Sequence, residues 1–124
     1  MAKKVTILIA DRNPNVREFL KREMTAENYQ VILADDAKTL LKMAFESQPV
    51  DILIFDPDLP DMEPAEIISK LECRTPPLPV VIHALPEAEI DYCGCSSSIF
   101  IEKGSRSIEV IKRIIRDIIT VRAL

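Results

Sequence analysis

Five charged or ionisable side chains of this sequence lie at or near the ends of apolar segments, where they could act together. They are Asp11, Arg12, Asp56, His83 and Lys103. A carboxylate can accept a phosphoryl group, and a lysine beside it can hold that group through its positive charge. A solvated loop explains any one of these residues taken alone. Their coincidence after four different apolar segments favours a single shared site.

The segments that position these residues alternate between apolar, β-rich runs and amphipathic stretches. We expect strands at residues 5–10, 29–33, 50–55, 79–84 and 99–102. We expect helices after Asn13, after Asp36, from Pro64 and from about residue 106 onward, with at most a short helix within 86–98. This alternation gives right-handed βαβ units, and five strands predict an α/β fold, a flavodoxin-like (βα)5 doubly wound parallel sheet of strand order 2-1-3-4-5.

In a sheet of this order, sites form beyond the carboxyl ends of the strands, at the point where the strand order reverses. The strands at residues 5–10 and 50–55 are neighbours at that point. Asp11 and Asp56 directly follow these two strands, so we expect the two carboxylates to lie close together.

Composition excludes several classes of function. The chain has 124 residues, which predicts one domain over residues 1–124, and its net charge of −4 argues against a nucleic-acid-binding surface. Two glycines are too few for a dinucleotide finger or a Walker A loop, and one histidine excludes a two-histidine metal site. Three cysteines favour a reducing compartment, and the pair Cys93 and Cys95 is not favoured as a metal or redox site. Without a leader or a long apolar run, we expect a cytoplasmic protein that spans no membrane.

The chain resembles a response-regulator receiver domain of two-component signalling over its whole length. The matching pieces are residues 7–11 with Pro14, residues 50–56 followed by Leu59-Pro60-Asp61-Met62, and residues 100–103. The resemblance implies that Asp56 is phosphorylated by a histidine kinase or a phosphotransfer protein. It also implies that Lys103 contacts the phosphoryl group and that Asp11 belongs to the acidic pair that holds Mg²⁺.

The sequence departs from the family pattern at several of these positions. Arg12 stands where the second acid of the pair, usually a direct metal ligand, is expected. His83 replaces the hydroxyl residue that bonds the phosphoryl group, while Ala84 keeps the small residue that follows it. Phe100 stands at the position of the switch aromatic, often tyrosine. These departures alter the metal site and the phosphoryl contact of the family pattern.

The charge of the pocket predicts that Mg²⁺ binds weakly or not at all. The usual pocket has three carboxylates and one lysine, whereas here Asp11 and Asp56 face Arg12 and Lys103, which leaves no net charge. If the ion binds, Asp11 and Asp56 would hold it. Asp58 could replace the lost ligand, although a solvated turn explains it better.

Two side chains of the pocket have open alternatives. Arg12 either turns inward to pair with Asp56 or Asp11, or points to solvent. His83 is either a partly buried imidazole bonded to the backbone or a donor to a phosphoryl oxygen. Its pKa should be depressed by the cations Lys103 and Arg12.

Three functions are consistent with these residues. The first is a phosphoacceptor receiver, which Asp56 and Lys103 favour. The only enzymatic activity expected of it is catalysis of its own phosphorylation. The second is a pseudo-receiver that acts as a phosphorylation-independent interaction module, which Arg12 and His83 favour. The third, a flavodoxin-like enzyme or cofactor binder, is disfavoured because the loops after the strands contain almost no glycine.

The last helix has a wider apolar face than packing on one sheet requires. Ile108, Ile111, Ile115, Ile118 and Ile119 gather on one side, and Val110, Ile114 and Val121 extend that side to about half of the circumference. The resemblance implies a partner surface on this helix, the fifth strand and the helix before that strand. We therefore expect a homodimer or an output partner there, unless neighbouring helices cover the extra residues.

Overall fold

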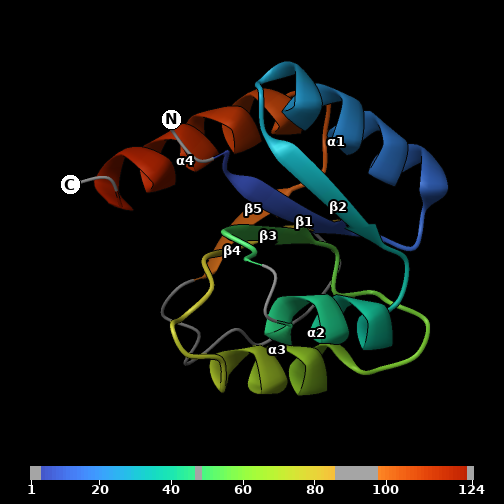
Figure 1. Cartoon of the computed structure of the whole chain (residues 1–124). Helices are drawn as coiled ribbons and strands as arrows, with labels where there is room; N and C mark the ends of the chain where they lie inside the picture. Colours follow the sequence, from blue (N-terminus) through green and yellow to red (C-terminus); the bar gives the residue numbers. More distant parts are fainter. Residues whose placement is uncertain (1–3, 47–48, 86–97, 123–124) are drawn as a thin grey trace.

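The computed structural model describes residues 4–46, 49–85 and 98–122, which contain five strands and four helices (Figure 1). The strands are β1 (Thr6–Ala10), β2 (Gln30–Ala34), β3 (Ile52–Phe55), β4 (Val80–Ala84) and β5 (Ser98–Glu102). The helices are α1 (Pro14–Ala26), α2 (Ala37–Phe45), α3 (Pro64–Glu72) and α4 (Ser107–Arg122). Residues 86–97 lie outside the described residues. They include Cys93 and Cys95 and nearly all of the short helix predicted within 86–98, whose last residue, Ser98, begins β5.

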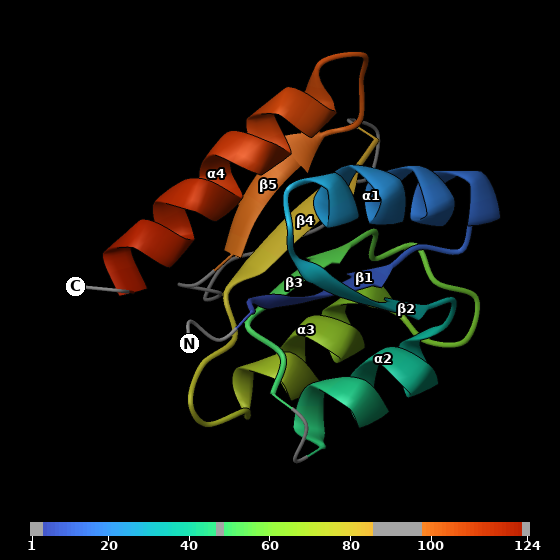
Figure 2. The ribbon, with the colours of Figure 1, turned by 45° about the horizontal axis from the view of Figure 1, so that its top comes forward.

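The strands form one parallel sheet in the order β2-β1-β3-β4-β5. Helices α1 and α4 cover one face of the sheet, and α2 and α3 cover the other (Figures 1 and 2). The predicted fold class and strand order are therefore confirmed. The strands shift from their predicted limits by at most two residues, as with β2, which begins and ends one residue later than expected.

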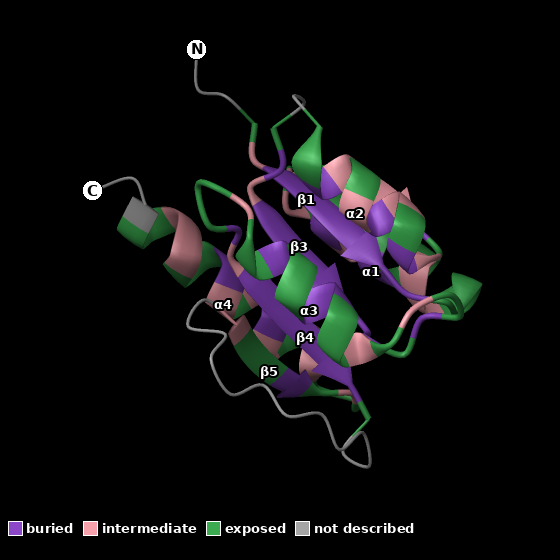
Figure 3. Ribbon diagram, turned by 90° about the horizontal axis from the view of Figure 1, so that it is seen from below, coloured by how far each residue is buried: buried purple, intermediate pink, exposed green. Residues whose placement is uncertain are grey.

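Three central strands are mostly apolar, with Thr6 and His83 as the polar exceptions, because helices cover both of their faces. Every residue of β1, β3 and β4 is buried (Figure 3). Alternate residues of each strand serve opposite layers of the core. Leu8 and Leu53 pack with α2 and α3, while Ile9 and Ile54 pack with α1 and α4.

Helices α1 and α2 begin where the sequence places side chains that satisfy the first backbone N–H groups. The Asn13 side chain accepts a hydrogen bond from the N–H of Asn15, and the Asp36 side chain accepts one from the N–H of Thr39. Pro64 occupies the first turn of α3, where its missing N–H costs nothing. The caps end the loops that follow β1 and β2, and Pro64 ends the loop that follows β3.

Candidate functional site

Two carboxylates lie side by side at the carboxyl ends of the two central strands. Asp11 and Asp56 are the first residues after β1 and β3, which pair in register up to Ala10 and Phe55. The N–H of Asp56 continues this ladder by donating to the carbonyl oxygen of Ala10 at 3.0 Å. Both aspartates are buried, so the predicted convergence of the two carboxylates is found.

The ammonium group of Lys103 bridges the two carboxylates. Its Nζ lies 2.6 Å from Oδ2 of Asp56 and 3.0 Å from Oδ2 of Asp11. The backbone holds it there, because the N–H of Lys103 donates to the carbonyl oxygen of Ala84 at 2.8 Å and extends the pairing of β4 with β5. Burial lowers the pKa of Lys103, but the hydrogen bonds to Asp56 and Asp11 outweigh it, and the pKa is raised overall.

Backbone N–H groups hold the other oxygen of each carboxylate. Oδ1 of Asp11 accepts from the N–H of Asn13, and Oδ1 of Asp56 accepts from the N–H of Asp58, both at 2.9 Å. Each carboxylate is thus fixed by its own two-residue turn and presents Oδ2 to Lys103. Such charge-assisted contacts orient the carboxylates before any ligand arrives.

Arg12 and Asp58 pair with each other at the rim of the pocket. Nη1 of Arg12 lies 3.6 Å from Oδ1 of Asp58, and their side chains are 54% and 76% exposed. The ion pair of Arg12 is therefore not made with Asp11 or Asp56, and Arg12 is not simply solvated either. Asp58 does not act as an inward-facing replacement ligand, because its carboxylate is exposed beside the guanidinium.

The side chain of His83 is buried and reaches α4. Its Nε2 lies 3.1 Å from Oγ of Ser107, which in turn donates to the carbonyl oxygen of Gly104 at 2.9 Å. His83 is therefore bonded to a side chain, and not to the backbone as one alternative expected. Burial first, and then the charge of Lys103, lowers the pKa of His83 to about 4. The pKa of His83 is therefore lowered in the predicted direction, and the charge of Lys103 contributes as predicted. Arg12 is not among the causes of this shift.

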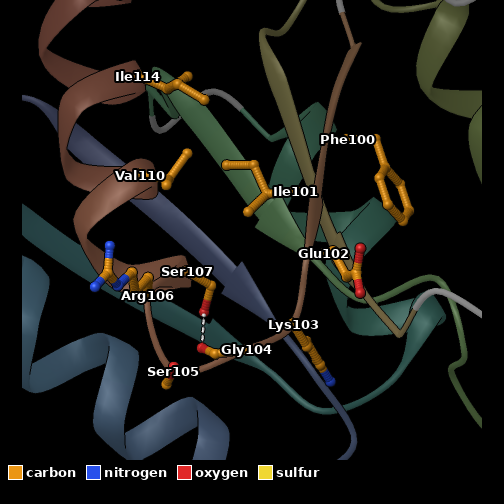
Figure 4. A pocket seen from close by; sticks show the side chains of 10 residues that line it. All are labelled: Phe100, Ile101, Glu102, Lys103, Gly104, Ser105, Arg106, Ser107, Val110 and Ile114. Atoms are coloured by element: carbon orange, nitrogen blue, oxygen red, sulfur yellow. Dashed lines mark hydrogen bonds between the residues drawn. The ribbon is translucent and has the colours of Figure 1, made fainter.

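Two further positions named from the family pattern differ in burial. Ala84 is fully buried next to His83. Phe100 is 43% exposed on the edge strand β5, and its ring extends to the side of β5 away from Val110 and Ile114 (Figure 4).

A groove of ≈ 540 Å³ lies where β5, the β5–α4 loop and α4 meet (Figure 4). Val110 and Ile114 line it, and both also pack partly against the core beneath α4. Val121 is 67% exposed. The extra apolar face is therefore partly covered by the domain itself at Val110 and Ile114, and open at Val121.

The pocket offers a magnesium ion two carboxylates, one fewer than the family pattern. Mg²⁺ requires oxygen ligands in an octahedral arrangement. Among the described residues, Asp11 and Asp56 supply the buried carboxylates of the pocket, and Lys103 engages an oxygen of each. At the position of the second acid of the family pattern, Arg12 provides a positive charge instead of a carboxylate ligand. Among residues 4–46, 49–85 and 98–122, no group of three or more acidic, histidine or cysteine side chains is arranged to hold a metal.

Two contacts of the site were not predicted from the sequence. Ser107 is the partner of His83, and nothing in its sequence context indicates this. Asp61 accepts from the N–H groups of Ala37 and Lys38 at 2.7 and 3.0 Å, which ties the loop after β3 to the start of α2. These backbone hydrogen bonds lower the pKa of Asp61. The position of Asp61 in the Leu-Pro-Asp-Met motif was the sequence feature that could have indicated its role.

Comparison with known proteins decides the family. Residues 7–115 match the family described as the response regulator receiver domain. The chain belongs to this family. As a receiver domain it has the carboxylate pair and the lysine where the resemblance placed them, and its parallel sheet has the strand order expected.

Curated relatives and solved structures agree with this assignment. The receiver domain is 31% identical to the response regulator GtcR of Aneurinibacillus migulanus over 112 residues, which cover 88% of this chain and 46% of GtcR. It is 35% identical to the sensor protein EvgS of Escherichia coli over 80 residues, covering 64% of this chain and 7% of EvgS. The chain thus spans less than half the length of these relatives.

Among solved structures, the response regulator TrrA of Thermotoga maritima, in complex with Mg²⁺ and BeF, superposes with a TM-score of 0.77 at 22% identity. The match covers 90% of this chain and 97% of TrrA. At this identity the likeness shows the fold alone. No helix within the described part of the receiver domain is long and apolar enough to cross a membrane.

Proposed function

We propose that this receiver domain accepts a phosphoryl group on Asp56 from a histidine kinase or a phosphotransfer protein and relays the signal through protein–protein contacts. The observation that carries the proposal is the Lys103 ammonium, 2.6 Å from one oxygen of Asp56 and 3.0 Å from Asp11. A buried carboxylate that is held by a cation and a backbone N–H is oriented for nucleophilic attack.

The chemistry requires no other nucleophile. A carboxylate oxygen of Asp56 bonds to phosphorus while the bond between phosphorus and the donor imidazole nitrogen breaks. The imidazole keeps the electron pair and takes up a proton from solvent. Lys103 stabilises the negative charge that gathers on the phosphoryl oxygens, because a positioned cation acts strongly in a partly buried site.

Labelling with acetyl phosphate tests this function. We expect the intact mass of the wild type to rise by one phosphoryl group and the mass of Asp56→Asn to stay unchanged. Asp58→Asn is the matched control, because Asp58 lies two residues away and its side chain is exposed. A wild type that is never labelled, by acetyl phosphate or by a phosphorylated phosphotransfer protein, would establish the pseudo-receiver alternative instead.

We further propose that the groove between β5 and α4, with Val121 beyond it, is the contact surface for a second copy of the domain. Its support is the exposure of Val121 and the apolar lining by Val110 and Ile114. Sedimentation should show a concentration-dependent dimer that Val121→Glu and Ile114→Glu weaken. Arg113→Glu, which places the same charge on an exposed position of α4, should leave it intact. A wild type that stays monomeric at high concentration contradicts this surface.

A further inference from the structure

The pocket lacks the positive charge that transfer to Asp56 requires. Once Asp56 carries a phosphoryl dianion, Lys103 is the one cation that bonds the buried carboxylates of the described site, and Asp11 adds a further negative charge. In receivers that bind a divalent ion, two positive charges would offset this excess. The donor set described above has one carboxylate fewer than the family pattern and a guanidinium at its rim, which weakens binding of that ion and leaves a role for another cation.

Arg12 is the cation in the right place. It follows Asp11 directly, and its guanidinium lies 3.6 Å from the carboxylate of Asp58. The N–H of Asp58 donates to Oδ1 of Asp56 at 2.9 Å. The guanidinium therefore lies against the same short turn that carries the phosphoacceptor, at the exposed rim of the pocket.

The contact that Arg12 makes in this structure is easily exchanged. At 3.6 Å and with both side chains more than half exposed, the pair with Asp58 contributes little to stability. A phosphoryl group offers two oxygens with more charge than one exposed carboxylate, and a guanidinium binds such a pair of oxygens in a bidentate manner. Rotation about the side-chain bonds of Arg12 would exchange Asp58 for the incoming phosphoryl group.

We propose that Arg12 is a catalytic residue that binds the phosphoryl oxygens during transfer, so that Asp56 is phosphorylated without a divalent metal ion. This inference rests on the proposed phosphoacceptor function. With acetyl phosphate as donor, the Asp56 oxygen bonds to phosphorus, the bond from phosphorus to the acetyl oxygen breaks, and acetate leaves with the electron pair. Lys103 and Arg12 contact the transferred group from opposite sides, one buried and one at the rim.

The test is the initial rate of labelling by acetyl phosphate, read by intact mass, in EDTA and in millimolar Mg²⁺. The wild type should be labelled at rates that agree within about twofold in the two conditions. Arg12→Ala should lose about 10²-fold in EDTA, the typical effect of removing one group that stabilises transition-state charge. Arg12→Asp should be labelled only in Mg²⁺. Arg22→Ala, which removes an exposed arginine of α1, should match the wild type.

The reversal of metal dependence between the wild type and Arg12→Asp is a readout that a merely structural role would not produce. All four proteins should have the same far-UV circular dichroism, because Arg12 is half-exposed. A wild type that is labelled only in Mg²⁺ overturns the inference and leaves the phosphoacceptor function standing. An Arg12→Ala variant as fast as the wild type in EDTA does the same. If neither the wild type nor Arg12→Asp is labelled under either condition, by acetyl phosphate or by a phosphorylated phosphotransfer protein, the phosphoacceptor function itself fails, and the inference with it.

Discussion

Replacing Lys103 by methionine should destabilise the domain by about 3 kcal/mol at neutral pH. The side chains of Asp11 and Asp56 are only 3% and 11% exposed, and the substitution leaves both without their cation. Because their Oδ2 atoms lie 3.0 and 2.6 Å from the same Nζ, these oxygens are at most about 5.6 Å apart. Two unit charges at that distance repel by at least about 3 kcal/mol at an effective dielectric constant of about 20.

Urea unfolding followed by circular dichroism measures this loss of unfolding free energy. Lys112→Met is the matched control, because Lys112 contacts a single, more exposed carboxylate, Glu23, at 2.9 Å. It should cost about 1 kcal/mol or less. The double variant Lys103→Met with Asp56→Asn should recover at least half of the loss, since one of the two facing charges is removed.

The stability difference between the wild type and Lys103→Met should also depend on pH. The folded-state pKa of Lys103 is raised, so its contribution is fully present below the unfolded value of about 10.4 and is lost as pH rises through the folded value. The gap between wild type and Lys103→Met should therefore stay constant from pH 7 to 9 and narrow above about pH 10.5. A variant within 1 kcal/mol of the wild type, or a double variant with no recovery, would refute the bridging role of Lys103.

Two further predictions follow from the surroundings of the pocket. The pKa of His83, about 4 in the fold against about 6.5 in an unfolded chain, means that the unfolded state takes up a proton first as pH falls. The wild type should therefore lose about 2 kcal/mol relative to His83→Gln between pH 7 and 5, and an NMR titration of this single histidine should show a neutral ring at pH 5.5. A protonated ring at that pH contradicts the buried environment. Asp61→Ala should lower the thermal midpoint and speed amide exchange at Ala37 and Lys38, because it removes the hydrogen bonds to their N–H groups. Asp35→Ala is the control and should change neither, since Asp35 makes no such hydrogen bond among the contacts described. Equal exchange in both variants would contradict the role of Asp61.

The fold and the centre of the site were predictable because they follow from apolar patterning along the chain. Apolar runs marked the buried strands, and parallel order then required Asp11, Asp56 and Lys103 to meet at one edge. The other contacts of the site join residues that are far apart in the sequence and depend on how the elements pack. Ser107 meets His83 only because α4 begins beside the end of β4, and no local pattern encodes that distance.

The position of Arg12 illustrates the same limit. Its charge was visible in the sequence, but its choice between Asp58 and the buried carboxylates was not. At the rim the guanidinium keeps its hydration, which burial beside Lys103 would remove, and this favours the pair with Asp58. The apolar face of α4 was also visible, while the share that the domain itself covers at Val110 and Ile114 depends on packing against the sheet.

The most direct test of the central claim is to locate the phosphoryl group after transfer from a phosphorylated phosphotransfer protein. Borohydride reduction of the labelled domain, followed by peptide mass mapping, converts a phosphoaspartate to homoserine and marks its position. We predict a single modified site at Asp56, with none in the Asp56→Asn variant and none at Asp11 or Asp58. Modification at another residue, or a domain that takes up no phosphoryl group while remaining folded, would contradict the account.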